Sequence, residues 1–410
     1  MSQGRVVVTG LGIVAPNGIG VEAYWDSLRS CRSGIGPIRR FDCTEHPVKV
    51  AGEVPDFNLR DYFGVAVRPH RYSRQTQMGL VACKEALCQA GLTSVSLQRM
   101  GDVPVFIGIS SSSTHVVEES IAVSQKRGPA NVPLTVRAYP PAATAGAIGE
   151  LFDFSASCTT ISCCCPSGLD AVMEASRLIR SGAADLVLAG AADSYVSPIT
   201  VAAFAAIGLT SRSEAYPPHE RSRPFDRNRT GAIFAEGAGF LVLERLEHAL
   251  ARGAQPRMEI VSGARYTDKP GEEELAGMGR SMRQALRNGG LLPGAVDYIC
   301  ADAASQPSLD AAESRMINQV FGADTMRIPV SSVRGVTGHA LAAAAMMQLV
   351  ALERIFHTGE IFPTANLTDP DPACALQHVQ DRPLAAQVQV AMANSRGMAK
   401  ENSTLVVRRI

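Results

Sequence analysis

Apolar and polar positions follow two different periods along this chain. Short runs such as Arg5 to Thr9, Val103 to Ile109 and Asp185 to Gly190 are almost continuously apolar, which is typical of strands buried on both faces. Between such runs, apolar residues recur every three or four positions, as in Gln75 to Ala90, a predicted helix that Gly91 ends. Strands that alternate with helices predict a layered α/β fold with mostly parallel sheets.

The order of elements from Val6 to Gly190 is loosely repeated after Met258. With 410 residues, the chain is also long for a single hydrophobic core. We therefore predict two similar units, at residues 1–253 and 254–410. The Ala-rich stretch from Ala340 to Phe356 is too short to span a bilayer, so it predicts a buried core helix.

The stretch from Thr159 to Ala171 is the most informative part of the sequence. It predicts a buried strand that ends near Ser162, a sharp turn that carries Cys165, and a helix from Pro166 to Ser181. A thiol at a helix N-terminus faces unpaired N–H groups and the positive end of the helix dipole, which favours the thiolate. Such a cysteine can accept an acyl group as a thioester. Alternatively, three adjacent cysteines are small buried apolar residues in a tight turn, and the motif alone favours neither interpretation.

Composition excludes several classes of function. Lys plus Arg and Asp plus Glu are both 39, so no excess charge points to a nucleic-acid partner or an anionic membrane. The 10 cysteines show no CxxC pairs or His-rich spacing, which argues against a zinc site. Their apolar surroundings, and the lack of a secretion signal before Arg5, predict reduced thiols in the cytoplasm. The early block Gly10 to Gly18 lacks the third glycine of a dinucleotide loop and contains Pro16, so nucleotide binding is disfavoured.

Four sequence blocks resemble the β-ketoacyl-acyl carrier protein synthases. In chain order they are TGLGIVAPNG near the start, Cys165-Pro-Ser-Gly168, Arg223-Pro-Phe-Asp226 with Glu236-Gly-Ala-Gly239, and Thr337-Gly-His339. The resemblance implies the thiolase fold, in which two similar halves form five α-β-α-β-α layers, and a dimer. It also implies a reaction without a cofactor: an acyl chain is loaded on the elbow cysteine, and malonyl on the phosphopantetheine of an acyl carrier protein is decarboxylated and condensed with it.

The same resemblance implies roles for individual residues. Cys165 matches the nucleophile and His339 matches the second of two histidines that stabilise the enolate, while Arg334 stands where a lysine is usual. The first histidine is replaced by Asp302. An ionised carboxylate would repel the enolate instead of donating to it, so we expect condensation to be severely impaired, since losing one oxyanion donor costs about 10²–10³ in rate.

The departures from the active enzymes resemble one branch of the family, the chain length factors that pair with a catalytic ketosynthase in bacterial polyketide systems. The family's glycine-rich gating loop, NSFGFGG, here contains Arg396, Gly397 and Met398. In chain length factors the helix that matches Thr114 to Lys126 crosses the dimer interface and lines the partner's tunnel. Its apolar face here carries Thr114, Val117 and Ile121 and no aromatic residue, so a less obstructed tunnel is implied. The alternatives are that other residues close the tunnel or that this is an ordinary core face.

The leading hypothesis is therefore a chain-length-factor-like subunit, with a catalytic ketosynthase and an acyl carrier protein as partners. Chain length factors commonly have glutamine at the elbow, whereas this chain keeps Cys165 and His339, so an active ketosynthase is the alternative. A thiolase or other acyl-CoA enzyme is disfavoured because residues 396–402 contain no second cysteine. The Arg-rich run from Arg221 to Arg229 could contact a carrier protein, but we interpret it as a structural loop.

Overall fold

The computed structural model describes residues 4–110 and 113–410. Within them, a mixed 12-stranded sheet runs in the order β13-β11-β10-β15-β16-β9-β1-β8-β7-β5-β6, with β2 paired to β1. The strands of this sheet are β1 (Val6–Ala15), β2 (Gly18–Ile19), β5 (Val103–Gly108), β6 (Ala156–Ile161), β7 (Leu186–Ser194), β8 (Glu236–Arg245), β9 (Met258–Thr267), β10 (Tyr298–Cys300), β11 (Pro329–Ser331), β13 (Gln377–His378), β15 (Val390–Arg396) and β16 (Glu401–Arg409). Two short pairs lie outside it, β3 (Ile35–Pro37) with β4 (Val50–Gly52) and β12 (Glu360–Ile361) with β14 (Leu384–Ala385).

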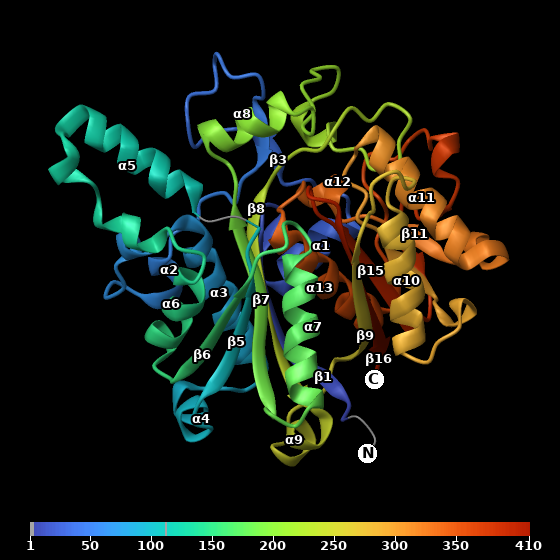
Figure 1. The fold of residues 1–410 in the computed structure, drawn as a ribbon, viewed down its shortest axis with the longest axis horizontal. Helices are drawn as coiled ribbons and strands as arrows, with labels where there is room; N and C mark the ends of the chain where they lie inside the picture. The colour runs from blue at the N-terminus through green and yellow to red at the C-terminus, as the bar shows by residue number, and fades with distance from the viewer. Residues whose placement is uncertain (1–3, 111–112) are drawn as a thin grey trace.

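The helices complete a five-layered arrangement. They are α1 (Val21–Arg29), α2 (Arg60–Phe63), α3 (Arg74–Gln89), α4 (Ser94–Arg99), α5 (Thr114–Arg127), α6 (Ala143–Phe152), α7 (Ser167–Arg180), α8 (Pro198–Ala206), α9 (Leu246–Ala251), α10 (Ala276–Asn288), α11 (Pro307–Phe321), α12 (Arg334–Thr337) and α13 (Ala342–Thr358). Helices α3 and α6 cover the outer side of the N-terminal strands, α10 and α11 cover the C-terminal strands, and α7 and α13 lie between the two sets (Figure 1). This arrangement confirms the predicted α/β fold with thiolase-type layers.

The prediction of mostly parallel sheets is wrong. Strand β1 runs antiparallel to β8 and β9, and β16 runs antiparallel to β9 and β15. Parallel pairing is confined to the two outer parts of the sheet, around β5 and around β10. The reason is local: a tight turn joins β15 to β16, and such a short connection can only reverse the chain, whereas parallel strands need a long crossover.

The glycine-rich block near the N-terminus belongs to a strand. The sequence predicted a strand that ends at Thr9, but β1 continues to Ala15. A side chain at Gly12 would place its Cβ 1.9 Å from the carbonyl oxygen of Ala82 on α3, and one at Gly10 would approach Ala86 in the same way. These glycines therefore allow α3 to pack closely on the sheet.

Helix α13 forms the centre of the main hydrophobic core. Every residue from Ala342 to Phe356 is buried, and small alanine side chains at its start allow α7 to lie close beside it. The Ala-rich stretch is thus a buried core helix, as predicted. Among the helices that the structure describes, none is both long and apolar enough to cross a lipid bilayer.

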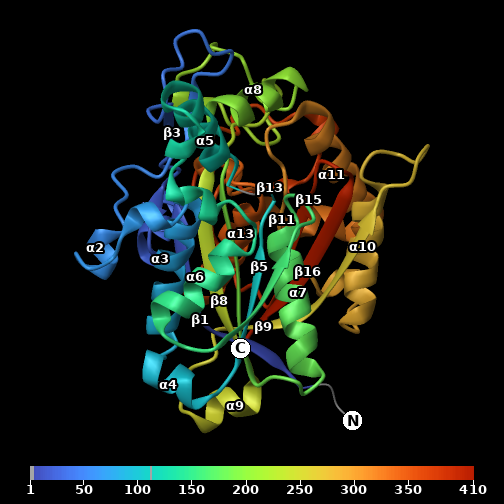
Figure 2. The same ribbon diagram turned by 60° about the vertical axis from the view of Figure 1, so that its left-hand side comes forward.

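Strand β6 ends the sheet, with β5 as its one neighbour in the described chain. The sequence predicted a buried strand here, but Ser157, Cys158 and Thr159 are exposed. Nearby, α5 projects away from the layers (Figures 1 and 2). These two elements leave one side of the N-terminal half open to solvent.

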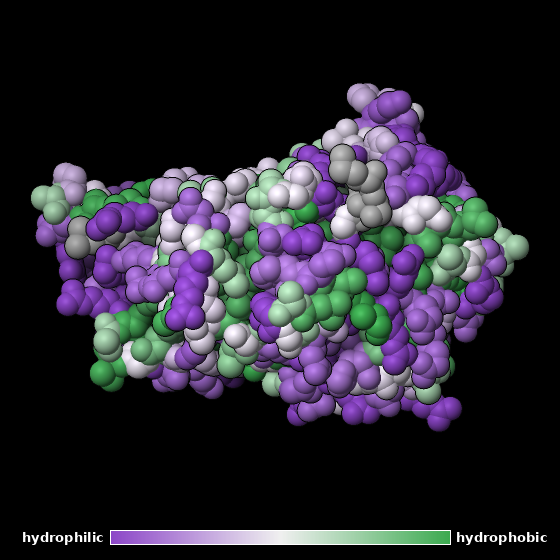
Figure 3. All heavy atoms as spheres, turned by 90° about the horizontal axis from the view of Figure 1, so that it is seen from below, coloured by the Kyte–Doolittle hydropathy of each residue, from purple (hydrophilic) through white to green (hydrophobic). Residues whose placement is uncertain are grey.

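The run from Arg221 to Arg229 is a structural loop, because buried Arg223 pairs with Asp226 and buried Arg229 pairs with Asp371. On the face seen from below, apolar side chains form several separate patches among polar ones (Figure 3). Small scattered patches of this kind are normal on soluble domains and need no partner to explain them.

Candidate functional site

Cys165 lies at a strained elbow between β6 and α7. The residue before it, Cys164, has φ of 54°, a left-handed conformation that is uncommon outside glycine. The Ser167 hydroxyl stabilises the turn, because it accepts a hydrogen bond from the Cys163 N–H (2.7 Å) and donates one to the Cys164 carbonyl. Strain of this kind is often found at functional positions. The predicted elbow is therefore present, and it fixes the direction of the Cys165 thiol.

The environment of Cys165 does not favour the thiolate. The residue is buried in an apolar cluster with Phe204, Phe234 and Leu341. Burial raises the pKa of the Cys165 thiol far above its ordinary value, the Asp302 carboxylate raises it further, and Arg334 only partly opposes them. The helix N-terminus predicted the opposite direction. That expectation is wrong because loss of solvation outweighs the helix dipole, whose effect is modest.

His339 faces the same cavity as a neutral imidazole. Its backbone N–H donates to the Ile233 carbonyl (2.7 Å), and its ring stacks on Phe234 with centroids 5.7 Å apart. Burial lowers the pKa of His339 well below its ordinary value, and the charges of Arg334 and Arg396 lower it further. The Arg334 guanidinium hydrogen-bonds to Nδ1. Because arginine can only donate, Nδ1 must be the acceptor and Nε2 carries the proton.

Asp302 lies in the loop after β10 and is paired with Arg334. The guanidinium of Arg334 donates to Oδ1, and the backbone N–H of Arg396 also donates to this carboxylate. Burial raises the pKa of Asp302, while the two guanidinium charges act to lower it. Arg334 therefore offsets part of the repulsion that an ionised Asp302 would exert on an enolate. Asp302 also offers no N–H donor where the resemblance implies an imidazole.

Two buried carboxylates that the sequence reasoning did not assign to the site hold this loop in place. Glu313 accepts from the N–H groups of Asp302 (3.0 Å) and Ala303 (2.8 Å), and Asp310 accepts from those of Ala304 and Gln306 (3.1 Å each). Burial is the main cause that raises the pKa of Glu313 to about 8 and that of Asp310 to about 6. Both residues lie in the first turns of α11, the helix that follows the loop. Acidic residues at that place are the sequence signal that could have found them.

The hairpin between β15 and β16 closes the other side of the site. Gly397 donates its N–H to the Glu401 carbonyl (2.7 Å), and a Cβ on it would lie 2.9 Å from Cβ of Cys164. The loop therefore lies directly against the elbow, and only glycine fits there without a shift. Arg396 and Met398 both line the cavity, and the Met398 side chain is half exposed.

These side chains surround one small cavity of about 90 Å³. Its polar lining includes Ser110, Cys165, Asp302, Gln306, His339 and Arg396, and its apolar walls include Tyr195, Phe204, Leu209, Phe234, Leu341 and Met398. A nucleophilic thiol and a neutral imidazole at one apolar cavity are the groups that acyl transfer requires. Arg334 is completely buried behind them and acts through Asp302 and His339.

The three residues that are predicted to line the partner's tunnel lie away from the Cys165 cavity of their own chain. Thr114 and Val117 on α5 are half buried and Ile121 is 49% exposed, and they are not among the described residues that line the Cys165 cavity. Within this one chain, α5 therefore contributes nothing to the cavity walls.

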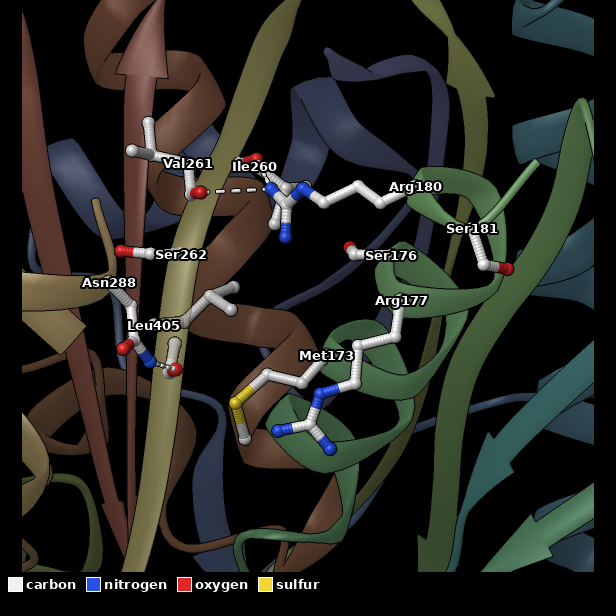
Figure 4. Close-up of a pocket in the computed structure, with 11 residues that line it drawn as sticks. Met173, Ser176, Arg177, Arg180, Ser181, Ile260, Val261, Ser262, Asn288 and Leu405 are labelled. Atoms are coloured by element: carbon white, nitrogen blue, oxygen red, sulfur yellow. Dashed lines mark hydrogen bonds between the residues drawn. The ribbon is translucent and has the colours of Figure 1, made fainter. Parts of the chain in front are cut away.

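A larger groove of about 450 Å³ lies between α7 and β9 (Figure 4). Arg180 on α7 donates to the carbonyls of Ile260 and Val261, so its guanidinium is hydrogen-bonded to the backbone of β9. The described residues that line this groove include no cysteine, histidine or carboxylate. We therefore place the candidate site at the Cys165 cavity.

Comparison with known proteins identifies the family of this chain. The family described as "Beta-ketoacyl synthase, N-terminal domain" matches residues 3–249, and "Beta-ketoacyl synthase, C-terminal domain" matches residues 258–368. The chain is 33% identical to the 3-oxoacyl-(acyl-carrier-protein) synthase 2 of a Synechocystis species, over 100% of this chain and 99% of that protein.

Two other relatives come from polyketide systems. The ketoacyl synthase alpha subunit of the tetracenomycin polyketide synthase from Streptomyces glaucescens is 34% identical over 100% of this chain and 98% of its own length. The solved ishigamide ketosynthase/chain length factor superposes with a TM-score of 0.92 at 30% identity, and the match covers 100% of both chains. Sequence, fold and cavity agree, and we conclude that this chain belongs to the beta-ketoacyl synthase family.

Proposed function

We propose that this chain is a chain-length-factor-like subunit of a type II polyketide synthase, which pairs with a catalytic ketosynthase and shapes its elongation tunnel. The observation that carries the proposal is the ion pair between Asp302 and Arg334. It places a carboxylate where the family resemblance implies an imidazole donor. No cofactor is needed in this role, because acyl groups travel on the phosphopantetheine of an acyl carrier protein.

The cavity is poorly equipped to condense acyl groups by itself. Removal of one oxyanion donor typically lowers the rate by about 10²–10³. Burial also raises the pKa of the Cys165 thiol, which disfavours the thiolate that acts as the nucleophile. Both effects favour a subunit whose partner performs the chemistry.

Two elements are suited to pairing with such a partner. Strand β6 is the last strand of its sheet, and the backbone hydrogen-bonding groups of alternate residues along it, such as those of Cys158, face away from β5. A strand from another chain can continue the sheet there. Helix α5 projects on the same side of the molecule (Figure 2), so we propose that Thr114, Val117 and Ile121 line the partner's tunnel.

Co-expression with a type II polyketide ketosynthase tests the proposal. We expect a stable complex with one copy of each chain, measured by size-exclusion chromatography and native mass spectrometry. Cys158→Arg should disrupt that complex because it places a bulky charge at the β6 edge, whereas Cys88→Arg, at another exposed cysteine, should not. Recovery of the chain only as an active homodimer would reject the proposal.

The second candidate is an active β-ketoacyl synthase. It is favoured by one observation, that Cys165 and His339 line the same cavity. Incubation with acyl-carrier protein followed by intact-mass measurement would then show an acyl adduct that Cys165→Ala abolishes. Addition of malonyl-carrier protein would give a condensed product at a rate ordinary for the family.

A further inference from the structure

The hydrogen bonds between β6 and β5 determine which residues of β6 face outward. Val103 donates its N–H to the Ser155 carbonyl (2.9 Å), and Ile109, just after β5, donates to the Ile161 carbonyl (3.0 Å). Successive residues of a strand point their backbone groups in opposite directions, so the odd-numbered residues are the ones bonded to β5. The backbone groups of the even-numbered residues therefore face away from β5, and these residues are Ala156, Cys158 and Thr160.

This outward edge lacks the features that normally prevent strand pairing. Native sheet edges are often protected by charged side chains or prolines, and β6, with the sequence ASCTTI, contains neither. Its outward-facing residues are small and uncharged. The middle one, Cys158, is a free, exposed cysteine. The edge is therefore suited to pairing with another strand, and a thiol lies at its centre.

A second copy of β6 fits this edge in antiparallel orientation. Two identical strands related by a two-fold axis run antiparallel, and one register pairs every outward-facing residue, with Cys158 opposite Cys158 and Ala156 opposite Thr160. Within β6, any other register leaves an outward-facing residue of each copy without a partner. The two central Cα atoms of a hydrogen-bonded antiparallel pair are about 5.5 Å apart, and disulfides join residues whose Cα atoms are about 4.4–6.8 Å apart. Both thiols lie on the same face of the joined sheet, because the axis is perpendicular to it.

We propose that Cys158 is a redox-sensitive cross-linking site, at which two copies of this chain that pair through β6 are joined by a disulfide. The oxidant is a low-molecular-weight disulfide such as oxidised glutathione. The Cys158 thiolate of one copy attacks it, which forms a mixed disulfide and releases one glutathione. The Cys158 thiolate of the second copy then attacks the protein sulfur of that mixed disulfide and releases the other glutathione. Two protein thiols are thereby oxidised, one glutathione disulfide is reduced, and the two protons end on the glutathione thiols.

This disulfide determines whether the β6 edge is free. In the cross-linked pair the edge of each copy is covered by the other copy, so no other strand can bind there, and reduction releases both. The inference does not rest on the proposed function, which assigns the same edge to a ketosynthase. Self-pairing is measured on this chain alone and the ketosynthase complex by co-expression, so the failure of one is distinguishable from the failure of the other.

Oxidation of the purified full chain tests the inference. The reduced protein is incubated with oxidised glutathione at about pH 8.5, where an appreciable fraction of an exposed thiol is ionised. Non-reducing electrophoresis and mass spectrometry of disulfide-linked peptides then identify the products. We expect a covalent dimer whose main linkage joins Cys158 to Cys158. Cys158→Ser should abolish this dimer, whereas Cys88→Ser, at another exposed cysteine, should leave its yield unchanged.

The register gives a second test, made in the Cys158→Ala variant. Ser157 lies opposite Thr159 of the other copy, and both residues are exposed. Ser157→Cys together with Thr159→Cys should therefore restore a cross-link between positions 157 and 159, and Ser157→Cys alone should not, because its two copies are offset along the strands. Three results would overturn the inference: a parent chain that takes up glutathione but stays monomeric, a dimer linked mainly through Cys88, and equal cross-linking with and without Thr159→Cys.

Discussion

Arg334 is completely buried and donates to two different acceptors, the carboxylate of Asp302 and Nδ1 of His339. Its planar guanidinium can hold both acceptors at once in a fixed geometry, which a single ammonium group does less well. One side chain thus offsets the charge of Asp302 and also determines which nitrogen of His339 carries a proton. Asp302 and Arg334 both differ from the residues that are usual in the family, and the two differences are best understood as a pair.

Breaking this pair from one side should destabilise the protein more than removing it completely. Asp302→Ala leaves the buried charge of Arg334 uncompensated, a change that typically costs about 3–5 kcal/mol. Adding Arg334→Met to that variant should recover part of the loss, because no unpaired charge remains. Urea denaturation of the two single variants and the double variant measures the coupling. Additive losses would show that the ion pair does not form.

Glu313 should make stability fall as pH rises. Its pKa is raised to about 8 in the folded state from an ordinary value of 4.5, so between these values only the folded state retains the proton. In that window the folded state binds more protons than the unfolded state, so the free energy of unfolding decreases with pH, by at most about 1.4 kcal/mol per unit. The loss should begin near pH 5 and be complete above pH 8.

The variant Glu313→Gln isolates this effect. The amide cannot ionise, so the slope of unfolding free energy against pH should flatten between pH 5 and pH 8, whatever the variant's absolute stability. Urea denaturation at four pH values across this window measures the slope. Identical slopes in the two proteins would contradict the assignment.

At the scale of elements, the site depends on two short turns that touch. The elbow before α7 and the hairpin between β15 and β16 meet at Cys164 and Gly397. Neither turn is long, and both adjoin buried elements, α7 at the elbow and β15 and β16 at the hairpin, so a shift in one must move the other. The position of Cys165 is thus determined from both halves of the chain.

Gly397→Ala should distort this contact. The added Cβ would lie 2.9 Å from Cβ of Cys164 and 3.1 Å from Cδ of Pro166, neither of which is the end of a flexible side chain. We expect a loss of about 1–3 kcal/mol, typical of overpacking, together with altered alkylation of Cys165 by iodoacetamide. Gly146→Ala on α6 is the matched control, since its Cβ would meet nothing within 4 Å and should be neutral or stabilising. Equal effects of the two substitutions would argue against the close contact.

Periodicity predicted several long elements well, since α3, α7 and α13 have apolar faces that any core would bury. Periodicity failed where tertiary contacts determine the structure. Gly10 and Gly12 were not predicted to lie in a strand, because the sequence does not show that α3 packs closely on them. Strand β6 was predicted to be buried, because no local feature of the sequence marks the edge of a sheet. The same limit applies to the site: the helix dipole at Cys165 is a local property, whereas the desolvation that outweighs it comes from Phe204, Phe234 and Leu341.

At the scale of the whole molecule, the side chains around Cys165 and the open side of the N-terminal half are separate. Cys165, His339 and Arg334 are buried, whereas β6 has exposed residues and α5 projects from the layers (Figures 1 and 2). A partner that covers β6 and α5 can therefore change without any change in the residues around Cys165. This separation suits a subunit whose influence on its partner is exerted through shape.

Ile121→Phe should shorten the product of the assembled synthase. In the proposed complex this exposed side chain enters the partner's tunnel, where a bulkier ring would stop chain growth earlier. Mass spectrometry of products from the co-expressed complex measures chain length, and Leu250→Phe, at another exposed apolar residue on α9, is the control. An unchanged product distribution from an intact Ile121→Phe complex would place α5 outside the tunnel.

The open edge of β6 also has a consequence for how the protein can be produced. A strand edge whose alternate residues have unpaired backbone groups can accept an extended segment, including the same strand of another copy. Material synthesised in excess of whatever normally covers this edge is therefore prone to self-association. Balanced synthesis of both chains should improve recovery more than any change to the interior.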